Sequence, residues 1–149
     1  MQALSKLIVC GVFISSVQAA QAACTLPEQT LFACTTAKNK AVAVCDLGDT
    51  ISYTYGKTGR KPELSLLLER KRVSTTQWQG IGRYENYAIY IPNGQTVYTL
   101  SHSRDKLKNN ATLEAGILVE TAGKQVANLA CLSKGLVANL HGVNLSNAP

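Results

Sequence analysis

The sequence predicts an all-β protein, a small antiparallel β-barrel of about eight strands in a simple meander, held together by disulfide bonds. Apolar residues alternate with polar ones over short runs, which is the pattern of a strand with one buried face. Turn sequences such as Leu47-Gly48-Asp49 and Asn93-Gly94 separate these runs at intervals of about 8 to 12 residues. Four cysteines follow the first 22 residues, and an even count in a small exported domain predicts two disulfide bonds.

The first 22 residues have the pattern of an export signal. Lys6 supplies a positive charge, residues 7–14 form an apolar run, and Ala20-Gln21-Ala22 offers small residues at the positions that a signal peptidase reads. The run is much shorter than the roughly 20 residues that span a bilayer. We therefore predict a signal peptide at residues 1–22, one domain at residues 23–149, no membrane span, and a periplasmic or secreted location.

The cysteines of the predicted domain are Cys24, Cys34, Cys45 and Cys131. A hairpin turn at residues 39–40 would place Cys34 opposite Cys45, so we predict a bond between them and a second bond between Cys24 and Cys131. The competing arrangement, Cys34 with Cys131 and Cys24 with Cys45, also ties the first strand to the last and stays open. The cysteines are too widely spaced for a zinc site, and we predict no metal and no cofactor.

Two runs of alternating residues predict the first strands clearly. In the first run Ile51, Tyr53 and Tyr55 share one face, and in the second Leu64, Leu66 and Leu68 do so. These faces are expected to form part of the core.

Asn93-Gly94 predicts a β-hairpin, because this dipeptide accepts the positive backbone angles of a two-residue turn. The expected cross-strand pairs are Ile91 with Thr96, Ile89 with Tyr98, Tyr87 with Leu100, and Glu85 with His102. This face is expected to be buried, whereas the opposite face, which carries Tyr84 and Tyr90, is expected to meet solvent or a partner.

Positive charges are concentrated in the predicted turns. Lys6 leaves with the signal, so 14 of the 15 Lys and Arg residues remain against 9 Asp and Glu, a net charge of +5. Alternate turns of a meander emerge at one end of a barrel, so we expect a basic rim there. Its members are Lys38, Lys40, Lys57, Arg60, Lys61, Arg83, Arg104, Lys106 and Lys108. The expected partner is a protein or an anionic glycan or lipopolysaccharide of the envelope, and no nucleic acid; alternatively, the charges only keep the protein soluble.

Residues that could carry catalysis are few. The predicted hairpin places Glu85 beside His102, with Ser103 nearby as a nucleophile to test. A cross-strand ion pair explains Glu85 and His102 without any reaction, so we expect no enzymatic activity. Trp78 precedes a Gly-Ile-Gly turn and is interpreted as a core residue rather than a sugar-stacking platform.

One segment carries a wider pattern: Ile81-Gly82-Arg83-Tyr84, then residues 87–92, Asn93-Gly94 and Val97-Tyr98. Together with Phe32, Cys34, Val44, Cys45 and Cys131, it resembles small exported bacterial proteins of the periplasmic lysozyme-inhibitor type. The resemblance implies an eight-stranded barrel, a closing disulfide at Cys131, and a loop that blocks the active-site cleft of a lysozyme. Ile81 stands where that family has a serine, and the positive net charge opposes binding to cationic lysozymes.

We therefore expect a non-enzymatic envelope protein that binds through a basic loop rim. The residues expected to bind are Arg83, Tyr84, Lys57, Arg60, Lys61, Arg104 and Lys106. The alternative is inhibition of a lysozyme or another peptidoglycan hydrolase through residues 82–84, with Arg83 and Tyr84 entering the cleft.

Overall fold

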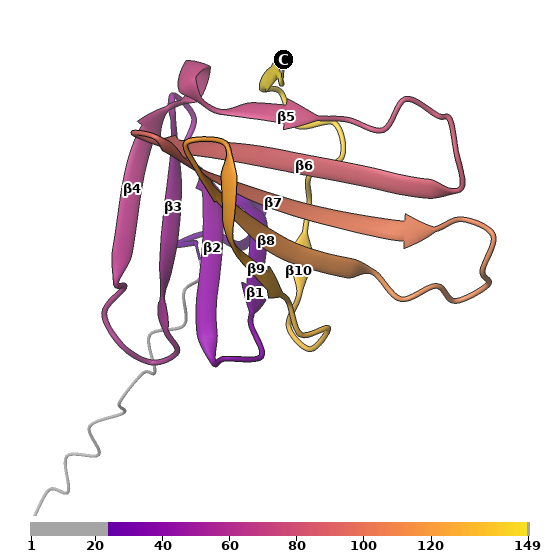
Figure 1. Cartoon of the computed structure of the whole chain (residues 1–149), viewed down its shortest axis with the longest axis horizontal. Coiled ribbons are helices and arrows are strands. Elements are labelled where there is room, and N and C mark those ends of the chain that lie inside the picture. The colour runs from indigo at the N-terminus through magenta and orange to yellow at the C-terminus, as the bar shows by residue number, and fades with distance from the viewer. Residues whose placement is uncertain (1–23, 149) are drawn as a thin grey trace, which may run out of the picture.

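Two β-sheets pack against each other in the computed structural model, which describes residues 24–148 (Figure 1). The five-stranded sheet has the order β10-β1-β2-β3-β4, and the six-stranded sheet has the order β11-β5-β6-β7-β8-β9. The strands of the first are β1 (Thr30–Thr35), β2 (Lys40–Asp46), β3 (Thr50–Lys57), β4 (Leu64–Glu69) and β10 (Val137–Ala138). Those of the second are β5 (Ser74–Thr76), β6 (Tyr84–Asn93), β7 (Thr96–Asp105), β8 (Glu114–Thr121), β9 (Lys124–Ala130) and β11 (Ser146–Asn147). The predicted signal peptide, residues 1–22, lies outside the described residues.

The predicted all-β, disulfide-containing architecture is confirmed, but the predicted closed barrel of about eight strands is wrong. Residues 24–148 form 11 strands in two separate sheets. A meander would pair β4 with β5, whereas β5 pairs with β6 and, in parallel, with β11. Figure 1 shows the strands of one sheet running across those of the other.

The chain changes sheets at a short 3-10 helix, η2 (Arg70–Arg72). The guanidinium of Arg70 donates to the backbone carbonyls of Gly48 and Asn144, at 2.6 and 2.7 Å, and forms an ion pair with Asp46. These contacts hold the corner between β4 and β5, so β5 starts a new sheet instead of extending the first.

Alternation of side chains buries one face of each strand, as predicted. On β3, Ile51 and Tyr53 are buried while Ser52 between them is half-buried on the other face. On β4, Leu68 is buried, whereas Leu67 is 67% exposed on the outer face. The period of two in the sequence therefore predicts the faces of these strands correctly.

The core lies between the sheets and takes side chains from both. Tyr53 of β3 stacks on Tyr98 of β7, with ring centroids 5.0 Å apart. The fully buried aliphatic and phenylalanine side chains of the core are Phe32, Val42, Val44, Ile51, Val73, Ile89, Ile91, Leu100, Ile117 and Leu140. Each such side chain contributes about 1.5–3 kcal/mol by leaving water, so this core fixes the two sheets face to face.

The β6–β7 hairpin has the predicted faces but a different register. Ile91 pairs with Tyr98, Ile89 with Leu100, Tyr87 with His102, and Glu85 with Arg104. Asn93 pairs with Thr96, so Gly94 and Gln95 form the loop, rather than Asn93 and Gly94. Gly94 has the positive φ, 60°, that a type II′ turn requires at its first loop position. The shift is an even number of residues, so the buried face is unchanged.

The disulfide bonds join Cys24 to Cys45 and Cys34 to Cys131. The favoured pairing is therefore wrong, and the competing arrangement is confirmed. Cys34 lies opposite Val42, and its side chain is in the core, whereas Cys45 lies on the other face of the sheet. Because Cys131 directly follows β9, its bond to Cys34 ties the two sheets together. Two formed disulfides are typical of oxidising compartments outside the cytosol.

Within residues 24–148, no helix has the length and apolar character needed to cross a lipid bilayer.

Candidate binding surfaces

The predicted basic rim is divided into two groups in the structure. Lys57, Arg60 and Lys61 lie at the β3–β4 turn, beside the β1–β2 turn, where the amide of Thr58 donates to the carbonyl of Asn39 at 3.2 Å. Arg83, Tyr84, Arg104 and Lys106 lie at the far end of the six-stranded sheet. Figure 1 shows these turns at the ends of different sheets. The expectation of one rim is wrong, because the chain changes direction as well as sheet after β4.

The loop between β5 and β6 (residues 77–83) and the loop between β7 and β8 (residues 106–113) lie side by side, and we call them the loop tip. The amide of Lys106 donates to the carbonyl of Arg83 at 3.0 Å. Arg83 Nε and Nη2 donate to the two carboxylate oxygens of Asp105 at 2.9 and 2.5 Å. The side-chain bonds from Arg83 lower the pKa of Asp105 to about 2, and the amide of Leu107 also donates to this carboxylate. Arg83 therefore clamps the two loops together.

Trp78 holds the β5–β6 loop, to which it belongs, in position. Its ring packs against the core, as predicted, and its Nε1 donates to the carbonyl of Ile81 at 2.9 Å. Lys106 Nζ lies 3.9 Å from the ring centroid, a cation–π contact. The indole thereby sets the position of an apolar side chain and of a cation at the loop tip.

The loop tip is strongly exposed and partly apolar. Ile81 is 84% exposed and Leu107 is 74% exposed, the two highest fractions among the large apolar side chains of residues 24–148. Tyr84 is 49% exposed, with the Arg83 guanidinium 5.4 Å from its ring centroid. Leu107 was not among the predicted site residues, although its place between Lys106 and Lys108 in a loop marks it as an unusual exposed leucine.

Glu85 and His102 do not form the predicted cross-strand pair. Glu85 instead accepts from Arg104 at 2.6 Å and from the Tyr87 hydroxyl at 2.8 Å, and these bonds lower the pKa of its carboxyl. His102 stacks on Tyr87 with ring centroids 5.2 Å apart, and burial lowers the pKa of its imidazole. Ser103 follows His102 on the strand and therefore faces the other side of the sheet. The three residues considered for catalysis thus point to different surroundings.

Metal-ligating residues are scattered: the described part of the chain contains no group of three or more His, Cys, Asp or Glu side chains placed to hold an ion. That the protein is not an enzyme stays a prediction.

No protein-family profile, no curated protein and no solved structure matches this chain. The likeness to lysozyme inhibitors therefore stays a prediction from the sequence.

Proposed function

We propose that this chain is a non-enzymatic protein of the periplasm or the secreted space that docks on an anionic, lipid-bearing component of the cell envelope through its loop tip. The observation that carries the proposal is the protrusion of Ile81 and Leu107 beside lysines. Lysine side chains attract phosphate groups, and the two apolar side chains can enter the acyl region below them. Lipopolysaccharide combines both chemistries.

Charge at the loop tip is available to a partner. Lys106 has no carboxylate within 4 Å among residues 24–148, and Lys108 Nζ lies 4.0 Å from Asp105. Both lysines flank Leu107 directly in the chain. The group at the β3–β4 turn differs, because residues 57–63 include no large apolar side chain. Glu63 of that turn is paired with Lys40 of β2.

A second candidate function is inhibition of a peptidoglycan hydrolase by the same loops. The half-exposed ring of Tyr84 favours it, since an aromatic side chain at a protruding loop suits a cleft. Arg83 contributes less than expected to this candidate, because its guanidinium is engaged by Asp105. The net charge of +5 favours an acidic hydrolase over a cationic one.

The test is cosedimentation of the mature, oxidised protein with three kinds of vesicle: phosphatidylcholine alone, phosphatidylcholine with phosphatidylglycerol, and phosphatidylcholine with lipopolysaccharide. Binding to the two anionic kinds is expected to weaken as ionic strength rises. Ile81→Ser with Leu107→Ser should lower binding at least tenfold, since burial of each side chain is worth about 1.5–3 kcal/mol.

Leu67→Ser is the matched control, because Leu67 is 67% exposed on β4, away from the loop tip. Equal binding by the double variant and the unchanged protein would refute docking through the loop tip. Loss of hydrolase inhibition in Tyr84→Ala, without vesicle binding by the unchanged protein, would establish the second candidate instead.

A further inference from the structure

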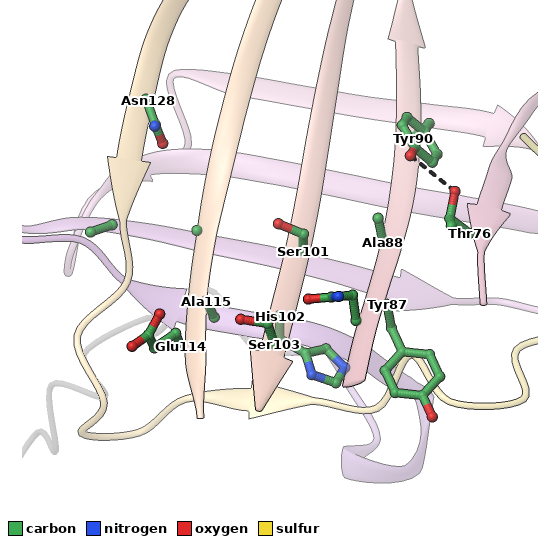
Figure 2. Close-up of a pocket in the computed structure, with 13 residues that line it drawn as sticks. Thr76, Tyr87, Ala88, Tyr90, Ser101, His102, Ser103, Glu114, Ala115 and Asn128 are labelled. Carbon is green, nitrogen blue, oxygen red and sulfur yellow. Dashed lines mark hydrogen bonds between the residues drawn. The ribbon is translucent and has the colours of Figure 1, made fainter. Parts of the chain in front are cut away.

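A hollow crosses the outer face of the six-stranded sheet, on the side away from the core (Figure 2). Its floor is a row of small residues that lie directly opposite one another on four adjacent strands: Ala88, Ser101, Gly116 and Ala130. Residues in such a row share one face of a sheet. The cavity volume is about 510 Å³, within the range of small-ligand sites.

Larger polar side chains flank the small residues on both sides. Figure 2 shows Tyr90 and Asn128 along one side and Ser103 with Glu114 along the other. The Tyr90 hydroxyl is hydrogen-bonded to Thr76 Oγ1 at 3.0 Å, which holds the aromatic ring in place. The hollow therefore has a fixed aromatic group and polar groups on either side of an open floor.

The polar lining is free to meet a ligand. Among hydrogen bonds within residues 24–148, none involves the side chains of Ser101, Ser103, Glu114 or Asn128. His102 also borders the hollow, but its ring stacks on the core residue Tyr87 on the other side of the sheet, so we assign it no contact with a ligand.

The charge of this lining differs from that of the loop tip. Glu114 is the one ionisable carboxylate in the lining, and no lysine or arginine contributes to it. An anionic ligand is therefore disfavoured here. Hydroxyl and amide groups around an aromatic ring match a neutral molecule with many hydroxyl groups.

The direction of the hollow distinguishes a sugar chain from a peptide. A peptide gains much of its affinity for a sheet by adding a strand at a free edge. The floor instead runs across the strands: it crosses β6, β7 and β8, whose backbones are already paired on both sides, and ends at the edge strand β9. A ligand that lies along the floor therefore does not add a strand to the sheet. Recognition must come from side chains, as suits a polyhydroxyl ligand.

We propose that this hollow binds a short segment of neutral oligosaccharide. The Tyr90 ring packs on a sugar face, while Asn128, Ser101 and Glu114 exchange hydrogen bonds with its hydroxyl groups. Binding occurs without cleavage, because glycoside hydrolysis ordinarily uses two carboxyl groups and this lining supplies one. The hollow lies beside the loop tip, since Ser103 and Glu114 also line a hollow with residues 108–112. Its floor and Tyr90 are outside the loop tip, so the inference goes beyond the proposed function.

The experiment titrates the mature, oxidised protein with three tetrasaccharides: β-1,4-linked N-acetylglucosamine, α-1,4-linked glucose, and acidic α-1,4-linked galacturonate. Amide chemical shifts and calorimetry report binding. At least one neutral tetrasaccharide is expected to bind, with shifts centred on β6 to β9, and galacturonate is not. Asn128→Ala should weaken binding about fivefold, the loss of about one hydrogen bond.

Val97→Ala is the matched control, because Val97 lies on the same face, outside the lining and beyond the row of Tyr90 and Asn128. Ser101→Phe, checked for an unchanged fold by its amide spectrum, should abolish binding by filling the floor. Absence of binding by both neutral probes, preference for galacturonate, or full binding by Ser101→Phe would overturn the proposal. The double variant at Ile81 and Leu107 should bind the tetrasaccharide normally, so the two proposals fail or stand independently.

Discussion

The rest of the chain covers the outer faces of the two sheets to different extents. On the five-stranded sheet, Ala41, Ala43 and Cys45 of β2 face outward, yet each is at most 8% exposed. On the six-stranded sheet, the corresponding outward residues Ser101 and Gly116 are only half-buried. The outward residues of β2 are therefore covered, whereas those of β7 and β8 are more accessible. The cover is incomplete, because a hollow of about 680 Å³ lined by Cys24, Ala33, Ala41 and Val137 remains on the five-stranded sheet.

Two local features cover the outward residues of β2 on the five-stranded sheet. The bond from Cys24 to Cys45 holds the N-terminal segment on it. The β3–β4 loop also folds back, since a Cβ atom at Gly56 would lie 2.8 Å from the backbone of Pro62. This comparison teaches that accessibility follows from the connections between strands rather than from the strands themselves.

Removal of the bond between the sheets should have the largest effect on stability. The Cys34–Cys131 bond spans 97 residues, for which chain entropy gives about 5 kcal/mol. Cys34→Ala with Cys131→Ala should lower the free energy of unfolding by about that amount in urea titrations. An effect smaller than that of removing the other bond would show that the sheets are held together by packing alone.

Removal of the Cys24–Cys45 bond should lower the free energy of unfolding by less than removal of the Cys34–Cys131 bond. It should also make the outer face of the five-stranded sheet more accessible. The Cys24–Cys45 bond spans 21 residues, worth about 3 kcal/mol. Cys24→Ala with Cys45→Ala should also expose apolar surface, measured as increased binding of a hydrophobic dye to the still folded protein. Unchanged dye binding would mean that the β3–β4 loop covers the face without help from the N-terminal segment.

The smallest effect on stability is expected for Asp105, at the loop tip, and this effect depends on pH. Asp105 has a pKa of about 2 against an ordinary value of 3.8, so below about pH 4 the unfolded chain binds the proton more readily. Stability contributed by Asp105 is therefore present above that range and is lost as the pH falls toward 2. Asp105→Asn should remove this part of the acid dependence of the melting temperature.

Arg83→Gln provides the control for that measurement, because Arg83 is the main cause of the lowered pKa. Its acid dependence should resemble that of Asp105→Asn. If only one of the two variants changes the profile, the clamp between the loops does not operate as described.

The strands and their buried faces can be predicted from the sequence, because the alternation that defines them involves residues close together in the chain. Alternation at residues 51–55 is local and is confirmed. The hairpin signalled by Asn93-Gly94 is also confirmed, but its loop is Gly94-Gln95. The switch of sheets depends on Arg70 reaching Asn144, far away in the chain, and no local pattern encodes that contact.

The candidate site is predictable only in part for the same reason. Arg83 and Tyr84 are correctly placed at a loop, but the clamp to Asp105 requires the true hairpin register. The hollow is missed because its floor is assembled from four strands. Each of its small residues is unremarkable alone, and only their alignment across the sheet creates the space.

The two shortest strands near the C-terminus have a consequence for the order of assembly. Phe32 pairs with Ala138, and Ser74 pairs with Ser146, so both sheets receive an outermost strand from residues synthesised late. Such distant partners raise the contact order, which slows folding because long loops must close first. Both sheets are thus complete only after the chain has been synthesised as far as residue 147.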